Sequence, residues 1–139
     1  VEMTAHNAKQ NGLAVEAAQA DVFDFLTELD KKKDHSYDYI VLDPPAFTKS
    51  GKTVHEAFRG YKEINYRAMK ILPRGGYLAT CSCSHFMGEE LFVKMVKEAA
   101  RDAGVTLRQI EFRQQAPDHP ILMTVPETYY LKFFLFQIV

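Results

Sequence analysis

The pair Pro44-Pro45 imposes the strongest constraint on how this chain folds. It follows the apolar, β-branched run Tyr37–Leu42, a composition typical of a buried parallel strand. Because proline lacks a backbone N–H and fixes φ, a strand cannot continue through two of them. A second apolar run, Tyr77–Cys81, passes into the polar segment Thr80–Ser84. We therefore expect two buried strands whose carboxyl ends both carry polar side chains.

Apolar runs alternate along the chain with segments of helical periodicity. We expect helices over Val1–Asn11, from an Asp21 cap through Leu29, over Val54–Leu72 and over Leu91–Ala103. The expected strands are Leu13–Ala20, Tyr37–Leu42, Tyr77–Cys81, Leu107–Phe112 and Tyr129–Val139. This alternation predicts an α/β fold with a parallel sheet that helices cover on both faces.

Bulk properties narrow the class of protein. The length of 139 residues fits a single domain, and no apolar stretch approaches the ~18 residues of a membrane span, so we expect no membrane partner. The net charge of −1 argues against a surface that binds nucleic acid everywhere. Cys81 and Cys83 are too close along a strand to form a disulfide easily, which predicts reduced thiols and a cytoplasmic protein. No metal site is expected, because these cysteines and His85 supply at most three ligands.

The segment Asp43–Phe47 (DPPAF) has the components of a site for a flat ring. The prolines make a stiff corner, and a residue before proline is held extended, which directs the Asp43 carboxylate out of the sheet edge. Asp43 could then hydrogen-bond the amidine edge of an aromatic ring while Phe47 stacks on it. The alternative is a turn that only ends the strand.

Two thiols, Cys81 and Cys83, lie at the end of the other strand. Cysteine is a small hydrophobe, so a strand cysteine is more often structural than reactive. Ser82 and Ser84 shift that balance, because they supply polar donors where a thiolate can be stabilised. In an extended strand both thiols would point to the same side. Together the two segments suggest an enzyme that holds a flat ring and attacks it with sulfur.

Other side chains near these segments are candidates for ligand binding. Asp21 is first of all a helix N-cap, but at the end of a strand it could also accept a hydrogen bond from the exocyclic amine of a cofactor. The sequence from Pro44 to Arg74 has seven basic residues and only two acidic ones, a local excess of positive charge. Of these, Lys49 and Lys52 follow DPPAF directly and are best placed to bind phosphates. The alternative for the helical members is a solvated helix face.

Several motifs in order resemble the catalytic domain of the bacterial 23S ribosomal RNA 5-methylcytosine methyltransferases. These enzymes are class I S-adenosylmethionine-dependent methyltransferases, so the resemblance implies a Rossmann-like sheet, mostly parallel with an antiparallel C-terminal strand. The matching segments are Asn7–Leu13 (NAKQNGL), Ala20–Leu26 (ADVFDFL), Asp43–Phe47, Gly75–Ser84 (GGYLATCSCS), Phe112–Gln114, Asp118–Pro120 and Tyr130–Lys132.

The resemblance implies covalent catalysis. A cysteine thiolate adds to C6 of a flipped-out cytosine, C5 becomes nucleophilic and takes the methyl group, and loss of the C5 proton with elimination frees the enzyme. The Ser-Cys-Ser pattern of this family places the nucleophile at Cys83, whereas the Thr-Cys-Ser pattern of related RNA enzymes selects Cys81. We expect Cys83 to attack and Cys81 to pack or assist.

The resemblance also implies ligands for the remaining residues. Asp21 contacts the adenine of S-adenosylmethionine, and Val22, Asp43 and Pro44 complete the cofactor-binding set. Asp43 in addition binds the N3/N4 edge of the target cytosine and stabilises the adduct. The partner is RNA, expected to be 23S ribosomal RNA. The substrate-binding residues are Pro45, Phe47, Lys49 and Lys52.

Parts of the family pattern lie outside this chain. Its glycine-rich first loop, the acidic residue that binds the ribose and the RNA-binding domain would all precede Val1. We therefore expect residues 1–139 to form one partial catalytic domain without its first strands, to bind S-adenosylmethionine poorly and to be inactive alone. The strands Leu13–Ala20 and Tyr37–Leu42 would then have unpaired edges, which favour self-association.

Two other functions stay open. A methyltransferase that acts on an exocyclic amine of a nucleic acid would use the DPPAF segment in the same way but would leave the cysteines idle. A non-catalytic binding module would use neither motif for chemistry.

Overall fold

The computed structural model describes residues 1–48 and 51–139. Four strands form one sheet in the order β1-β2-β4-β3. The elements along the chain are α1 (Glu2–Gln10), α2 (Val22–Lys32), β1 (Tyr39–Leu42), η1 (Gly51–Thr53), α3 (Val54–Ile71), β2 (Tyr77–Ser82), α4 (Glu89–Ala103), β3 (Leu107–Arg113), η2 (Pro126–Thr128) and β4 (Lys132–Ile138).

The sheet is mixed, with one strand running against the other three. β1 and β2 pair in parallel, whereas β4 pairs antiparallel with both β2 and β3. β4 therefore lies between β2 and β3 and points the opposite way. This arrangement confirms the predicted α/β class and the predicted antiparallel C-terminal strand. The strand itself is shorter than the expected Tyr129–Val139, because ladder pairing begins at Lys132.

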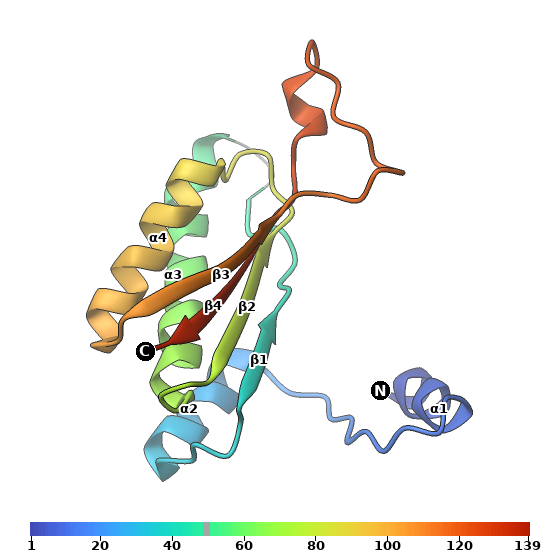
Figure 1. Cartoon of the computed structure of the whole chain (residues 1–139), viewed down its shortest axis with the longest axis vertical. Coiled ribbons are helices and arrows are strands. Elements are labelled where there is room, and N and C mark those ends of the chain that lie inside the picture. The colour runs from blue at the N-terminus through green and yellow to red at the C-terminus, as the bar shows by residue number, and fades with distance from the viewer. Residues whose placement is uncertain (49–50) are drawn as a thin grey trace.

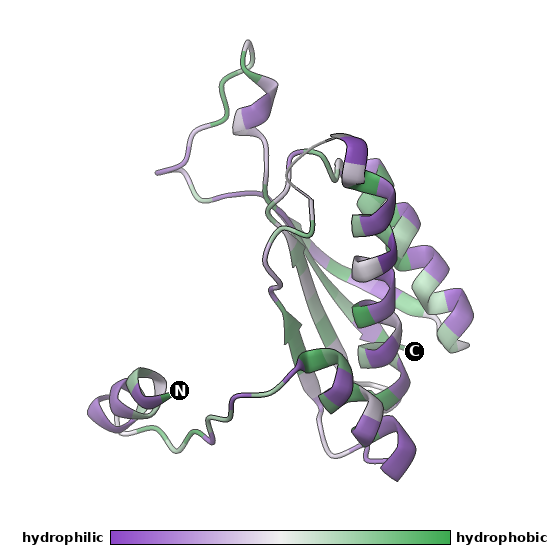
Figure 2. Ribbon diagram, turned by 180° about the vertical axis from the view of Figure 1, so that it is seen from behind, coloured by the Kyte–Doolittle hydropathy of each residue, from purple (hydrophilic) through white to green (hydrophobic). Residues whose placement is uncertain are grey.

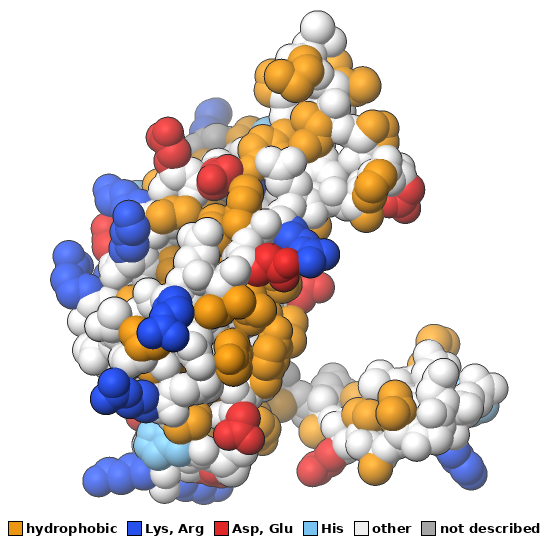
Figure 3. Space-filling model, viewed as in Figure 1, with side chains coloured by type: hydrophobic (Ala, Val, Ile, Leu, Met, Phe, Trp, Pro, Cys, Tyr) orange, Lys and Arg blue, Asp and Glu red, His pale blue; other side chains and the backbone are white. Residues whose placement is uncertain are grey.

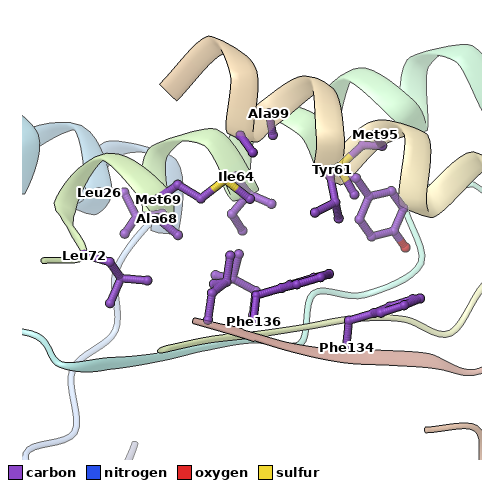
Figure 4. Close-up of a cluster of buried hydrophobic side chains, with 14 of the residues drawn as sticks. Leu26, Tyr61, Ile64, Ala68, Met69, Leu72, Met95, Ala99, Phe134 and Phe136 are labelled. Carbon is purple, nitrogen blue, oxygen red and sulfur yellow. The ribbon is translucent and has the colours of Figure 1, made fainter. Parts of the chain in front are cut away.

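Three helices, α2, α3 and α4, form a single layer against one face of the sheet (Figures 1 and 2). Side chains of β4 alternate in burial, and those of Phe134 and Phe136 point into the helix layer (Figure 4). They meet an apolar stripe on α3 that includes Tyr61, Ile64 and Ala68. The stripe confirms the helix expected from the spacing of apolar residues in this part of the chain.

The opposite face of the sheet carries no helix, so the prediction of a sheet covered on both faces is wrong for the described residues. Hydrophobic side chains gather on this open face (Figure 3). Tyr39, Val41 and Ile110 are 49%, 59% and 48% exposed. The apolar character of the strands was correctly predicted, but apolar strands do not specify which segment covers them. Among the described helices, α1 is the one that does not join the layer.

The predicted strand Leu13–Ala20 does not form. The segment is an extended connection that leads away from the sheet to α1, which stands apart from the rest of the fold (Figure 1). Leu13 and Val15 are exposed, and Ala8 is the one buried residue of α1. A strand needs a neighbour for its backbone hydrogen bonds, and the described residues offer none beside this segment.

Helix ends follow local signals in the sequence. The Asp21 carboxylate caps α2, where its Oδ1 accepts hydrogen bonds from the amides of Phe23 (2.9 Å) and Asp24 (3.2 Å). At the other end of the layer, Gly104 closes α4 in the left-handed region at φ 72°. Within the described chain, no helix is long and apolar enough to span a lipid bilayer.

The Asp21 cap predicts a measurable loss of stability on its removal. Asp21→Ala should lower the free energy of unfolding by about 1 kcal/mol, because two amides at the start of α2 lose their acceptor. Asp21→Asn keeps an acceptor oxygen and is the matched control, with stability close to that of the unsubstituted chain. Urea denaturation followed by circular dichroism measures both. Equal stability of the two variants would contradict this role.

Candidate active site

The two polar motifs meet at one edge of the sheet. β1 and β2 are parallel neighbours, and Leu42 lies opposite Thr80 in their register. Asp43, which follows β1, and Cys81, which is still within β2, are therefore the next neighbours in this register. The charge of Asp43 raises the pKa of the Cys81 thiol. The edge where the motifs meet is the carboxyl edge of the parallel pair, where ligands bind in open α/β sheets.

A hollow of about 530 Å³ lies beside this edge. It joins the start of α2 to the segment after β1, so Asp21 and Asp43 share one cavity although they are far apart in the sequence. All four residues predicted to bind a cofactor line it, together with two of the predicted substrate residues. The six are Asp21, Val22, Asp43, Pro44, Pro45 and Phe47.

The carboxylates of this hollow remain available to a ligand. Both cap bonds of Asp21 go to Oδ1, and Oδ2 accepts no hydrogen bond among the described residues. Capping and ligand binding therefore do not compete for the same oxygen. Asp43 is exposed. The hollow thus offers two acceptor groups beside apolar side chains, which suits a flat, amine-bearing ring.

Phe47 is held in place by the helix behind it. Its ring packs edge-on against Tyr61 of α3, with centroids 4.6 Å apart. Gly60 lies against the same ring, and a Cβ there would make an ordinary van der Waals contact at 3.4 Å from Phe47 Cδ2. The ring is half-buried, so a wall of fixed orientation faces the hollow.

The two thiols have different environments, contrary to the expectation that they point the same way. β2 ends at Ser82, which leaves Cys81 buried in the strand and Cys83 exposed in the following loop. Burial, together with smaller effects of the charges of Asp43 and Cys83, raises the pKa of Cys81 to about 11. Cys81 is therefore protonated near neutral pH, which leaves Cys83 as the accessible sulfur.

Buried polar groups that the sequence analysis missed join the two motifs. Ser84 donates from its hydroxyl to the carbonyl of Thr48, 3.2 Å away, and its amide donates to Ser82 Oγ. Ser82 in turn donates to the hydroxyl of Tyr61, which is fully buried. Burial raises the pKa of Tyr61, so it stays neutral in this network. The segments after β1 and β2 are thus one hydrogen-bonded unit.

The predicted basic patch is only partly free to bind an anion. Lys52 is exposed in η1, close in sequence to the hollow. Lys62 instead pairs with Asp102 at 2.7 Å and Glu98 at 3.5 Å, across the α3–α4 contact. Lys62 therefore has the role of a helix-surface residue, which was the alternative to binding phosphates. Lys49 lies outside the described residues.

The sequence of this chain is similar to those of proteins with known names. Ribosomal RNA large subunit methyltransferase I of Aeromonas salmonicida is 44% identical over 135 residues, which is 95% of this chain and 34% of that protein. The protein of the same name from Photobacterium profundum is 45% identical over 131 residues, 92% of this chain and 33% of its own length. The chain thus spans about a third of the length of the curated relatives it matches. No protein-family model matches.

Solved structures share the fold at low sequence identity. A structure from Streptococcus mutans, named as a SAM-dependent methyltransferase, superposes with a TM-score of 0.79 at 20% identity and covers 98% of this chain and 35% of that one. A Thermus thermophilus structure, named as a DNA modification methylase complexed with S-adenosyl-L-methionine, gives 0.52 at 12% identity, with coverage of 86% and 53%. The Rossmann-like methyltransferase fold predicted from the sequence is confirmed.

The unequal burial of the thiols predicts selective alkylation. Near neutral pH, iodoacetamide should modify Cys83 at least ~100-fold faster than Cys81, because a thiol with pKa about 11 is almost entirely protonated and is also shielded. Peptide mass spectrometry of the folded chain gives both rates. In urea the two rates should become similar, which is the control for intrinsic reactivity. Comparable rates in the folded chain would contradict the assignment.

Proposed function

We propose that this chain belongs to an S-adenosylmethionine-dependent methyltransferase that acts on ribosomal RNA. In this proposal it carries the parts of the active site that bind the target base and the adenine of the cofactor. Two observations carry the proposal: the Cys83 thiol is accessible, and Asp43, Pro45 and Phe47 line a hollow at the same edge of the sheet. Asp43 and Cys83 are close enough to this edge that the charges of both raise the pKa of Cys81. The identity to ribosomal RNA large subunit methyltransferase I supports an RNA substrate. The favoured reaction is methylation of cytosine C5, since that position needs a nucleophile at C6 to become reactive.

In this proposal the residues of the hollow bind the adenine part of the cofactor. Asp21 Oδ2 would accept a hydrogen bond from the exocyclic amine, and Val22 and Pro44, which line the same hollow, would contact the ring. When bound, S-adenosylmethionine supplies the methyl group. The carboxylates are exposed and uncommitted to ion pairs among the described residues, which fits an amine-bearing ligand.

The remaining residues act on the cytosine. Cys83 as a thiolate forms a bond from sulfur to C6 while N3 takes up a proton from solvent, and the Asp43 carboxylate accepts hydrogen bonds from the resulting N3–H and N4–H edge. C5, now nucleophilic, gains the methyl group. Loss of the C5 proton, cleavage of the sulfur–C6 bond and loss of the N3 proton then restore the aromatic ring and the thiolate. Pro45 and Phe47 orient the ring, and Lys52, with Lys49, contacts the phosphates that flank it. We propose 23S ribosomal RNA as the partner.

A covalent trap tests the nucleophile. RNA that contains 5-azacytosine has no proton to lose at the position equivalent to C5, so a methylated adduct cannot eliminate the enzyme sulfur. The trap needs only one addition per molecule, so it can report on a chain that is expected to be inactive in turnover. With millimolar S-adenosylmethionine to offset weak cofactor binding, the chain should form an adduct that survives denaturing electrophoresis. Cys83→Ala should abolish the adduct, whereas the matched variant Cys81→Ala should retain it.

Two outcomes of this trap argue against the proposal. Loss of the adduct in Cys81→Ala but not in Cys83→Ala would assign the nucleophile to the other thiol. Transfer of methyl groups to an exocyclic amine without any adduct would favour the amine-directed alternative.

The cofactor side of the hollow should bind weakly by itself. Asp21 and Asp43 are both exposed and Val41 beside them is 59% exposed, so the described residues enclose a ligand on one side only. Isothermal titration of the chain should give a Kd for S-adenosylmethionine well above the micromolar range, and adenosine should bind about equally well. A micromolar Kd for S-adenosylmethionine would contradict this account of the hollow.

A further inference from the structure

Lys132 is a lysine in the interior of the fold. It begins β4, lies opposite Ser82 in the ladder and is 1% exposed. Its ammonium donates to the carbonyl of Ser84 at 2.5 Å and to the carbonyl of Tyr130 at 2.7 Å. Among the described residues it forms no ion pair with a carboxylate. Its charge is therefore solvated by backbone carbonyls instead of water.

This position is costly for a cation. Burial lowers the pKa of Lys132 to about 8, although the Cys83 thiol acts in the opposite direction. The Ser84 carbonyl does not need the ammonium as a hydrogen-bond donor, because it also accepts a hydrogen bond from the amide of Met87 at 3.1 Å. The neighbours along β4, Phe133 and Phe134, are aromatic, so an apolar side chain would suit the strand better.

We propose that Lys132 is a positioning residue for Cys83, which it serves by fixing the adjacent Ser84 peptide and by placing a positive charge beside the sulfur. The inference rests on the proposed role of Cys83 as the nucleophile. Cys83 precedes Ser84, so the contact with the Ser84 carbonyl limits how far the thiol can move. The Cys83 thiol raises the pKa of Lys132, so the two side chains are close enough for their charges to interact.

Other charged groups at this junction do not replace Lys132. Asp43 and Cys83 both act on the buried Cys81 and on Tyr61, in the direction that keeps these two groups neutral. A negative charge at Asp43 disfavours a thiolate nearby, so a cation is needed to offset it. The titratable groups around the junction include Asp43 after β1, Lys52 in η1, Tyr61 on α3 and Cys81 in β2. His85 lies in the loop that carries Cys83 and is exposed. Glu89 and Tyr129 form a hydrogen-bonded pair, as do His119 and Tyr130.

Lys132 also connects the loop after β2, which carries Cys83, to the segment between β3 and β4. This segment projects beyond the sheet (Figure 1). Its second acceptor, the Tyr130 carbonyl, lies at the base of this segment. Gln115, at the other side of the base, accepts a hydrogen bond from the amide of Leu131. The ammonium thus connects the loop that carries Cys83 with the base of the projecting segment.

Alkylation kinetics test the proposal without RNA or cofactor. Near neutral pH, iodoacetamide should react with Cys83 about three- to tenfold more slowly in Lys132→Met than in the unsubstituted chain, because the thiolate loses its nearby cation. Lys132→Arg keeps the charge and should restore most of the rate. Lys97→Met makes the same chemical change on the exposed face of α4 and should have no effect.

The pH profile separates an electrostatic role from a structural one. Lys132 loses its proton near its pKa of about 8, so the rate advantage over Lys132→Met should shrink above about pH 9. A deficit of equal size at all pH values, or no deficit near neutral pH, would overturn the proposal.

A titration of the lysine itself keeps the test independent of how the Lys132 variants fold. Nuclear magnetic resonance of the Lys132 side chain should give a lower pKa in Cys83→Ser than in the unsubstituted chain, because the attraction from the thiolate is removed. Cys83 is exposed, so the serine variant keeps the packing of the fold. An unchanged Lys132 pKa would contradict the electrostatic interaction between Lys132 and Cys83 and would overturn the proposal.

The two proposals fail in different ways. If Lys132 controls Cys83 alkylation but no RNA adduct forms, the positioning role stands and the proposed reaction fails. If Cys83 forms the RNA adduct and its alkylation is indifferent to Lys132, the reaction stands and the positioning role fails.

Discussion

The parallel pairing of β1 with β2 is the interaction on which the site depends. Its register sets Leu42 beside Thr80, so the segments that follow both strands leave the sheet at one edge. Proline stops one strand at that point, and the Ser84 hydroxyl then bonds the Thr48 carbonyl across the gap. A slip of one residue would turn the side chains of β2 to the opposite face and separate the two motifs.

Burial then distinguishes groups that are chemically alike. Only one residue separates Cys81 from Cys83, yet β2 ends at that residue. The Cys81 thiol is therefore buried and the Cys83 thiol is exposed to solvent. The same interior keeps Tyr61 neutral and lowers the pKa of Lys132. Reactivity at this edge therefore follows from where the strand ends, and the helix layer behind it supplies the rigid support.

The parts that could be predicted from the sequence are those with local signals. The Asp21 cap, the apolar stripe of α3 and the end of β1 at two prolines each depend on a few neighbouring residues. Residues 13–20 show the limit, because an apolar run becomes a strand only when another strand lies beside it. Tyr130–Lys132 is one of the segments that resemble the family, but the sequence does not predict a role for Lys132. Its contact with Ser84 spans 48 positions, and no spacing rule predicts such a pair.

The central claim is that the segments after β1 and β2 are the two halves of one cytosine site. A crystal structure of the chain joined to RNA that contains 5-azacytosine tests it most directly. We expect a covalent bond from Cys83 Sγ to C6, with the Asp43 carboxylate within hydrogen-bond distance of the N3/N4 edge. A bond from Cys81, or a base bound away from Asp43, would contradict it.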